Sequence, residues 1–355
     1  LSQIEGRGLT ESVLDLMVGK LERLDQEAQS ALTTAAAMGN RFQLSAMASL
    51  SDTALETVFE TLLPALQAGV VVTTSEADAL TMDDGAEGGE CRFFHDRVQQ
   101  AAYSLLDQGE RAALHLRIGR MFLAAAPGED RGEKIFEIVD QLNRGRELLT
   151  GPEELIELAE LNLEAGHKAA SSGAYAAAVE YLDVALAAAA PDGWQAHYEL
   201  TMSIHHELAV AGHLVGDHDR ADELTSAALK HARTELEKAE VLVGVVRLYT
   251  TAARYNDALE AMHRGLKLIG HELPSGDVQA AMGAAFGVVQ EKLGAATPAS
   301  LLDRPTMSDP EIRAATRLLI AGMAAAFYVD PFLYSLIVFR AMALALEHGH
   351  PPEGV

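Results

Sequence analysis

The fold of this chain is decided by the stretch Gly173-Ala174-Tyr175-Ala176-Ala177-Ala178-Val179-Glu180-Tyr181-Leu182-Asp183-Val184-Ala185-Leu186. The pattern is a small residue, a ring, an alanine, and a second small residue seven positions after that alanine. The same order recurs from Gly216 to Leu229 and again from Ala253 to Leu266. A unit that repeats in this way predicts an array of similar helical hairpins.

Small residues at fixed spacing let the two helices of a hairpin approach closely, as in the second half of a tetratricopeptide repeat. A further residue of modest size precedes each unit by seven positions, at Gly166, Ala209 and Val246. The equivalent alanines are 43 and 37 residues apart, longer than the ~34 of the regular repeat. We therefore predict irregular tetratricopeptide-like hairpins over 156–270. The ring positions are expected to serve packing, namely Tyr175, His218 and Tyr255.

The rest of the chain is also predicted to be nearly all helical, because alanine and leucine dominate and are the strongest helix formers. Residues 271–355 are expected to form further helical hairpins that are truncated at the C-terminus. Within them Asp309 is a predicted N-cap with Pro310 at the first helical position. A break is expected at Asp330-Pro331.

One segment departs from the helical pattern. Val70-Val71-Val72-Thr73-Thr74 is β-branched throughout, and Cys91-Arg92-Phe93-Phe94 is a suitable partner strand. β-Branched and aromatic runs around a Gly/Asp-rich loop predict a hairpin. The loop between them has about 16 residues, so we expect a mobile tip.

Three helices are predicted before this hairpin. The first covers 25–38, with Asp25 as N-cap and Gly39 as the C-terminal stop. The second covers 44–50, and the third follows Ser51-Asp52, which can cap it, and ends at Gly69. Three helices and a hairpin are a winged-helix topology, predicted over 25–110 and followed by connecting helices over 111–155. Because the third helix carries Glu56 and Glu60 and no Lys or Arg, a DNA-reading role is not expected.

Composition limits the possible functions further. The 355 residues include 27 Lys and Arg against 52 Asp and Glu, a formal net charge of −25. A duplex-binding domain needs clustered cations to displace counterions, so no nucleic-acid partner is expected. A single cysteine, Cys91, excludes a disulfide framework. The longest charge-free run near the C-terminus, 318–329, is shorter than the ~20 residues of a spanning helix. We therefore expect no membrane partner and a cytoplasmic location, and we interpret the chain as a piece of a longer protein.

No motif in the chain predicts catalysis. A phosphate-binding G-x-x-x-x-G-K-[ST] loop and a G-x-S-x-G elbow do not occur, so an enzymatic activity of this segment stays uncertain and no catalytic residue is proposed. The histidines between 205 and 218 lack the H-E-x-x-H spacing of a zinc site. We interpret them as the surface of a repeat helix, with no metal site. The glutamates between 153 and 164 are interpreted as a solvated helix face, with a protein-binding role as the alternative.

The remaining constellation is the run from Phe93 to Tyr103. A strand delivers Phe93 and Phe94, and His95 and Asp96 follow at the junction with a helix. Asp96 is suited to cap that helix. Backbone N–H groups at a helix N-terminus attract anions, so His95 is either a structural capping residue or an anion contact. The residues alone do not choose between them.

Three segments resemble the signalling ATPases of the STAND class, multidomain NTPases related to the AAA+ fold. They are the run from Leu21 to Phe42, the run from Phe93 to Gly119-Arg120, and Asp140-Gln141-Leu142-Asn143-Arg144-Gly145. The resemblance extends to large bacterial proteins that join a Ser/Thr kinase domain, a predicted ATPase module, helical repeats and often a sensor histidine kinase. It implies that residues 1–24 end the lid helices of a preceding ATPase domain.

Phe94-His95-Asp96 also resembles the Met-His-Asp motif of the related NOD-like immune receptors. The resemblance implies that His95 contacts the β-phosphate of bound ADP and that Asp96 fixes the junction. ATP or ADP would bind mainly to a domain outside this chain, so no cofactor is expected for the segment alone.

Together these features predict a regulatory or sensor segment. Its winged helix would close on its own nucleotide-binding domain, and its repeats would bind a protein or small-ligand signal. Two alternatives stay open: a tetratricopeptide-like interaction scaffold without nucleotide switching, and the regulatory part of a MalT-like transcription activator.

Overall fold

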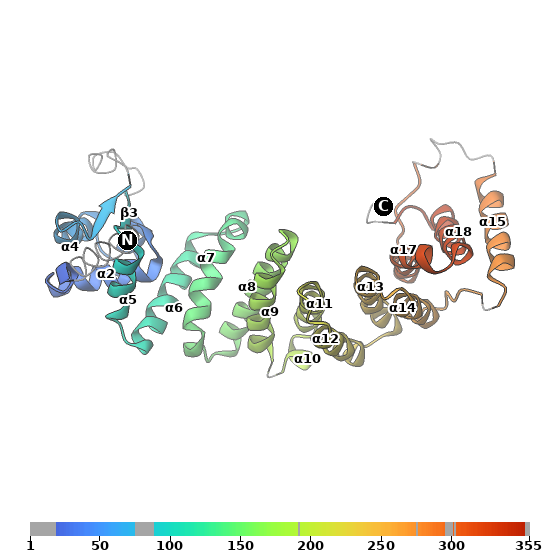
Figure 1. Ribbon diagram of the computed structural model, residues 1–355, viewed down its shortest axis with the longest axis horizontal. Coiled ribbons are helices and arrows are strands. Elements are labelled where there is room, and N and C mark those ends of the chain that lie inside the picture. The colour runs from blue at the N-terminus through green and yellow to red at the C-terminus, as the bar shows by residue number, and fades with distance from the viewer. Residues whose placement is uncertain are drawn as a thin grey trace, which may run out of the picture. The chain divides into compact units, whose positions relative to one another are not determined.

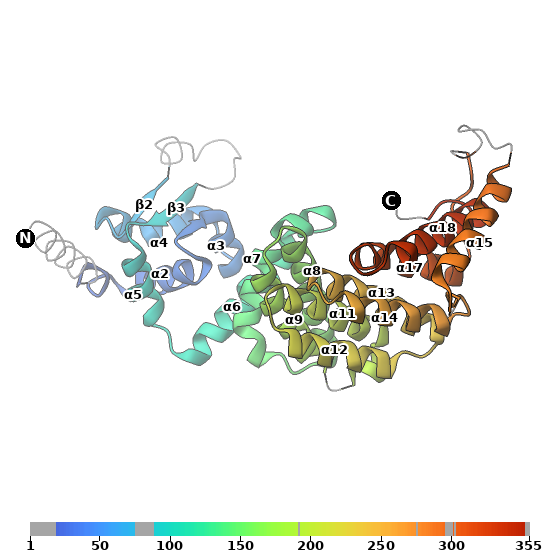
Figure 2. The same cartoon turned by 45° about the vertical axis from the view of Figure 1, so that its right-hand side comes forward.

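A computed structural model describes residues 19–74, 89–190, 192–274, 276–294, 301 and 303–351. The chain divides into two compact units, 1–165 and 166–355, which are described separately (Figures 1 and 2). The five-part division predicted from the sequence stays a prediction. The predicted loop tip between the two hairpin strands and residues 1–18 lie outside the described residues.

The first unit begins with helices and strands that alternate along the chain. They are α2 (Gln26–Met38), β1 (Arg41–Gln43), α3 (Leu44–Ser51), α4 (Leu55–Gln67), β2 (Val71–Thr73), β3 (Glu90–Phe93) and α5 (Asp96–Ser104). The strands form an antiparallel sheet in the order β1-β3-β2. Because alternate residues of β3 point to opposite faces, Cys91 and Phe93 are buried while Arg92 is exposed. The buried faces pack on helices α2 and α4 through Leu32, Leu62 and Phe93.

The three predicted helices and the predicted hairpin are confirmed. Asp25 caps α2 by accepting a hydrogen bond from the Ala28 amide at 2.8 Å, as expected. One strand was missed in the sequence, and one cap was misplaced. Strand β1 was not predicted, although Arg41-Phe42-Gln43 alternates between exposed and buried positions. Asp52 does not cap α4: it ends α3 in the left-handed conformation, with φ 51°, and α4 begins after Ala54 without a side-chain cap.

Three longer helices complete the first unit. They are α6 (Gln108–Ala125), α7 (Glu129–Gly145) and the first part of α8 (Pro152–Ser171), with a short 3₁₀ helix (Arg146–Leu148) before α8. Helices α6 and α7 approach closely at two glycines. A Cβ atom on Gly145 would lie 2.7 Å from the Ala112 carbonyl oxygen, and one on Gly119 would lie 2.6 Å from Leu142. Any larger residue at either position would push the two helices apart.

The second unit consists of helical hairpins. The helices are α9 (Tyr175–Ala189), the short α10 (Gly193–Ala196), α11 (Tyr198–Leu214), α12 (His218–His231), α13 (Glu235–Thr251), α14 (Tyr255–Leu268), α15 (Val278–Leu293), α17 (Pro310–Val329) and α18 (Pro331–His348). Neighbours in the chain pack on each other: α11 contacts α9, α12 and α13, and α17 contacts α13, α14 and α18. The predicted fold class, mainly all-α with tetratricopeptide-like hairpins, is confirmed.

The repeated sequence pattern has a clear structural meaning. Its first small residue is the turn between the two helices of a hairpin, where the backbone adopts a positive φ: 82° at Gly173, 93° at Gly216 and 58° at Ala253. Its alanine is buried against the partner helix in all three units (Ala178, Ala221 and Ala258). The ring of Tyr255 packs as expected, since it stacks on Tyr328 with centroids 4.8 Å apart.

Within the residues that the structure describes, two helices are long and apolar enough to cross a membrane by length and composition: α17 and α18. From the sequence, we expected no stretch of sufficient length. That expectation was wrong, because it considered only runs without any charged residue. The criterion is weak, since core helices of soluble proteins also satisfy it. In α17, 44% of the apolar window is buried, and Arg317 pairs with Glu240 of α13 at 2.8 Å. Helix α17 thus has the contacts of a core helix.

The turn residues yield the first prediction. Alanine in the left-handed region is strained by about 1–2 kcal/mol relative to glycine, so Ala253→Gly should stabilise the second unit by roughly 0.5 kcal/mol after the entropy of the unfolded chain is subtracted. Gly216→Ala is the matched control. It adds a Cβ atom with nothing within 4 Å, so it should destabilise through backbone strain alone, by about 1 kcal/mol. Urea unfolding measures both, and changes of the same sign would contradict this account.

Candidate functional site

The predicted site lies at the junction of β3 and α5. His95 has an extended backbone and is the N-cap of α5, where its Nδ1 accepts a hydrogen bond from the Arg97 amide at 3.2 Å. The capping role expected for Asp96 was therefore assigned one residue too late. Because Nδ1 is an acceptor here, a neutral His95 carries its proton on Nε2. The side chain is exposed, so this donor can reach a ligand.

Asp96 ties the junction to the end of α2. Its Oδ1 accepts a hydrogen bond from Asn40 Nδ2 at 2.6 Å, and the Phe93 amide donates to the Asn40 carbonyl at 2.9 Å. Asp96 thus joins the first turn of α5 to Asn40, although it does not cap the helix. The role implied for Asp96 in fixing the junction stays a prediction.

Positive charge gathers beside this junction, although the chain as a whole is strongly acidic. Arg41 and Arg92 are exact cross-strand neighbours in β1 and β3, so their side chains leave the same face of the sheet. Both are exposed, as is Arg97 in the first turn of α5. Glu90 partly compensates them by pairing with Arg41 at 3.4 Å. Two like charges directly opposite each other destabilise a sheet, and an anion held between them would relieve that cost.

Several residues of the segments that resemble STAND proteins contact one another next to this junction. Gln99 Nε2 donates to the Ala36 carbonyl at 2.9 Å. The Tyr103 hydroxyl lies 2.7 Å from His115 Nε2, and His115 Nδ1 lies 2.6 Å from Gln141 Oε1. Gln141 Nε2 in turn donates to the Ala37 carbonyl at 3.1 Å. Segments of α2, α5, α6 and α7 are therefore joined by one set of polar contacts.

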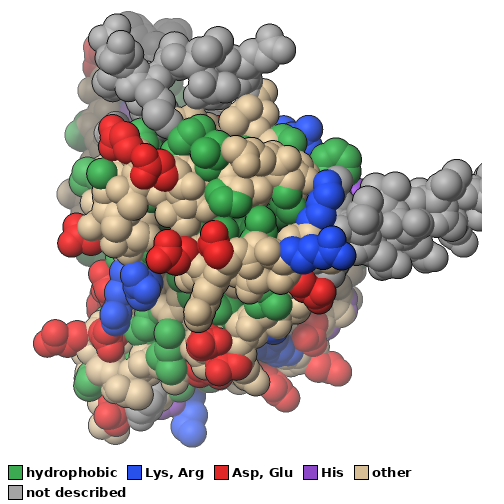
Figure 3. Space-filling model, turned by 90° about the vertical axis from the view of Figure 1, so that its left-hand side faces the viewer, with side chains coloured by type: hydrophobic (Ala, Val, Ile, Leu, Met, Phe, Trp, Pro, Cys, Tyr) green, Lys and Arg blue, Asp and Glu red, His purple; other side chains and the backbone are tan. Residues whose placement is uncertain are grey.

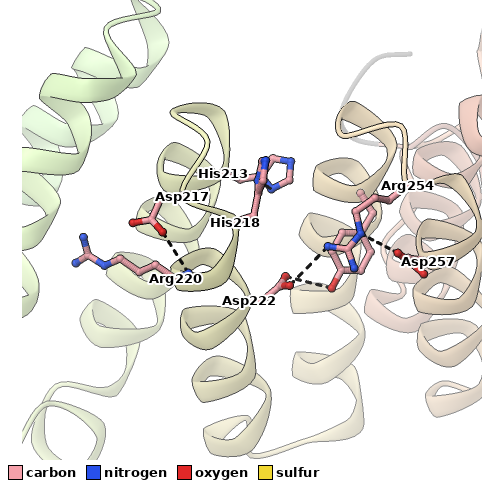
Figure 4. A network of polar contacts seen from close by, with 8 residues as sticks. His213, Asp217, His218, Arg220, Asp222, Arg254 and Asp257 are labelled. Atoms are coloured by element: carbon pink, nitrogen blue, oxygen red, sulfur yellow. Dashed lines mark hydrogen bonds and ion pairs between the residues drawn. The ribbon is translucent and has the colours of Figure 1, made fainter.

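A second polar network lies in the repeats, around Arg254 (Figure 4). Arg254 Nε donates to Asp257 Oδ2 at 2.7 Å, its Nη1 pairs with Asp222 at 3.6 Å, and its guanidinium lies 4.1 Å from the centre of the Tyr249 ring. Tyr249 also donates to Asp222 at 3.2 Å. The network connects α12 with α13 and α14. Its members line an open groove of about 380 Å³ between these three helices.

A separate ion pair joins α12 to the preceding hairpin, where Arg220 pairs with Asp183 of α9. Its amide is capped by Asp217 at 3.4 Å. The partners around Arg254 and Arg220 are between a third and a half exposed. Exposed ion pairs contribute about 0.2–1 kcal/mol each, so these pairs align neighbouring hairpins more than they stabilise them.

The histidines between 205 and 218 are not all on the surface, which corrects the sequence interpretation. His205 and His213 are 7% and 6% exposed. His205 Nδ1 bonds to the Thr201 carbonyl, and its ring contacts Trp194 at 4.5 Å. His213 Nδ1 lies 3.0 Å from His218 Nδ1. Burial lowers the pKa of both buried histidines. Within the described ranges, no three His, Cys, Asp or Glu residues are arranged to hold a metal ion.

The glutamate face of α8 is also only partly a solvated surface. Glu153, Glu157 and Glu160 are exposed as expected. Glu154 pairs with Arg120 of α6, and Glu164 pairs with Arg131 of α7 at 3.1 Å. Part of the acidic face therefore holds α8 against the preceding helices.

Comparison with known proteins gives one informative match. No family model matches the chain. The chain is 27% identical over 319 residues to hybrid signal transduction histidine kinase G of Dictyostelium discoideum, and the match covers 76% of this chain and 9% of that protein. The chain thus spans less than a tenth of the length of this relative.

Among solved structures, the chain is similar to a Signal Transduction ATPase with Numerous Domains (STAND) protein with a tetratricopeptide repeat sensor from Pyrococcus horikoshii. The identity is 13%, the TM-score is 0.38, and the match covers 88% of this chain and 46% of that one.

His115 gives a prediction for pH dependence. Burial lowers its pKa below 6.5, helped by the charge of Arg144 and opposed by the hydrogen bond to Gln141. Between the lowered pKa and 6.5 the unfolded chain binds more protons, so the stability from neutral His115 is complete above pH 6.5 and is lost as the pH falls. Urea unfolding at pH 7.5, 6.5 and 5.5 should show a steeper loss for the wild type than for His115→Gln, by at most about 1.4 kcal/mol per pH unit. Equal slopes would contradict it.

Proposed function

We propose that this chain is the regulatory segment of a longer STAND-type signal-transduction protein. The observation that carries the proposal is the 27% identity to a hybrid signal transduction histidine kinase, which extends over most of this chain. The order of elements from α2 to β3 supports a winged helix, in which three helices precede the last two strands. The hairpins that follow would receive a protein or small-ligand signal, in a cytoplasmic protein.

We propose that the winged helix acts as a lid and not as a DNA-binding module. Helix α4 exposes Glu56 and Glu60. On the face shown in Figure 3, Lys and Arg side chains are scattered among Asp, Glu and apolar side chains. A duplex needs a continuous basic footprint. Among the described residues, an open groove of about 420 Å³ between α2, α3 and α4 has a mixed lining that includes Met47, Val58 and Glu27 and no Lys or Arg. Such a lining suits contact with another protein domain better than contact with phosphates.

The proposed switch is a shift between two populations. ADP bound to a nucleotide-binding domain outside this chain is contacted through its β-phosphate by His95, which favours a closed form. Occupancy of the repeats favours an open form that exchanges ADP for ATP. The Nε2 donor of His95 and the exposed guanidinium groups of Arg92 and Arg97 are groups that suit a phosphate.

The proposal is tested in the protein that carries the upstream sequence. His95→Ala should speed the dissociation of ADP about tenfold to a hundredfold, because a hydrogen bond to a charged group contributes roughly 1.5–3 kcal/mol. Stopped-flow release of a fluorescent ADP analogue measures the rate. The matched control is His167→Ala, a histidine of α8 whose side chain is 68% exposed, which should leave the rate unchanged.

If His95→Ala releases ADP at the wild-type rate, the switch role of His95 is refuted. An upstream sequence without a phosphate-binding loop would instead favour the scaffold alternative, in which the repeats bind a partner protein and no nucleotide takes part.

A further inference from the structure

Helix α5 is held by a small apolar contact and by several hydrogen bonds. It has nine residues, of which only Val98 and Ala102 are buried apolar side chains. The ring of Tyr103 also packs against the core. Three residues of α5 make hydrogen bonds to other elements: Asp96 accepts from Asn40, Gln99 donates to the Ala36 carbonyl, and the Tyr103 hydroxyl contacts His115. These three residues follow one another by three and four positions, so they lie on one face of the helix. The orientation of α5 therefore depends on polar partners in α6 and at the end of α2.

The hydrogen bond of Tyr103 is the first of three in a row, and the donor and the acceptor of each can be assigned. The Ala37 carbonyl can only accept, so the atom of Gln141 that faces it is the amide nitrogen, and Oε1 faces His115. An amide oxygen can only accept, so His115 Nδ1 carries the proton. His115 Nε2 is then an acceptor, and the Tyr103 hydroxyl donates to it. One continuous chain of donors runs from α5 through α6 and α7 to α2.

The middle of this chain is sealed from water. His115 is 1% exposed and Gln141 is 6% exposed. A buried polar group that loses its partner costs about 1–3 kcal/mol. Loss of any single link therefore leaves the next member unsatisfied, so the links should form and break together. Cooperative breaking distinguishes a connected series of hydrogen bonds from three independent ones.

We propose that Tyr103, His115 and Gln141 are positioning residues that hold α5, and with it His95 at its N-terminus, in a fixed orientation on helices α6 and α7. A displacement of α6 and α7 relative to α2 breaks the chain and frees α5 to turn. If the proposed function holds, ADP retention by His95 depends on Tyr103 and Gln141, although neither residue touches the nucleotide.

The structural part is tested on the 355-residue chain by hydrogen–deuterium exchange. Tyr103→Phe removes only the hydroxyl, and Gln141→Met removes both hydrogen bonds of the amide at similar volume. Each should speed exchange of the α5 amides about tenfold. Asn143→Ala is the matched control. It breaks the paired hydrogen bonds between Asn143 and Asn162, at 2.8 and 2.9 Å, on the same helix α7, and should leave α5 unchanged.

The double variant decides whether the contacts form a chain. Tyr103 and Gln141 are joined only through His115. If the links act together, Tyr103→Phe with Gln141→Met should exchange no more than about twice as fast as the faster single variant, whereas independent bonds would multiply to about a hundredfold. In ¹⁵N spectra of labelled histidine, His115 should carry its proton on Nδ1 in the wild type. Multiplicative rates, a proton on Nε2, or equal acceleration by Asn143→Ala would overturn the inference.

The functional part uses the protein with its upstream sequence and ADP as the probe. Tyr103→Phe should speed ADP release as His95→Ala does, by at least about fivefold, while Asn143→Ala should not. If His95→Ala speeds release and Tyr103→Phe does not, the positioning role is refuted and the proposed function stands. If α5 loosens as expected but neither variant changes ADP release, the nucleotide contact fails and the positioning of α5 stands.

Discussion

Close approach of helices at glycine and alanine is the constraint on which both units depend. Aromatic residues make up only 5% of the chain, so large side chains cannot fill wide gaps between helices. In the first unit Gly119 and Gly145 allow α6 to lie against α7, and in the second Gly166 faces Leu182 and Gly265 faces Leu318 at distances that exclude a Cβ atom. Interiors are packed as densely as organic crystals. Helices that pack this closely can contact each other only where the sequence has Gly or Ala. The spacing of these residues is the repeated pattern of the sequence.

A short helix with few buried side chains is oriented mainly by its hydrogen bonds. Helix α5 buries two apolar side chains and is aligned by Tyr103 through the buried His115. In the repeats, Arg254 aligns α12 with α13 and α14, but its partners are about half exposed. The two networks differ in strength for that reason. Water screens the contacts of Arg254, whereas the chain through His115 has no water to replace a lost partner. The first unit therefore has the more cooperative connection.

Local features of the fold could be predicted from the sequence, and long-range ones could not. Asp25 and Asp309 each accept from amides two or three residues further on, so their capping roles are visible in a few neighbouring residues. Repeat spacing identified the hairpins for the same reason. Strand β1 is three residues long and exists only because β3 pairs with it, and the burial of His213 depends on helices distant in the chain. At the candidate site the sequence indicated His95 and Asp96, but the partners Asn40 and His115 come from other elements, and no local pattern indicates them.

The placement of charged side chains says more about the candidate site than the net charge of the chain does. In the repeats, basic side chains are placed beside acidic ones, as Arg220 is beside Asp183 and Arg254 beside Asp257. At the junction of β3 and α5 Arg41 also pairs with an acidic residue, Glu90, but Arg92 lies directly across from Arg41 on a sheet of very short strands. Like charges in that register oppose strand pairing, and a chain with 52 acidic residues has ample means to avoid them. A phosphate near His95 would convert this repulsion into attraction for both guanidinium groups. Under the proposed function, the cost of pairing two arginines without a ligand is the physical reason to expect a phosphate on this face of the sheet.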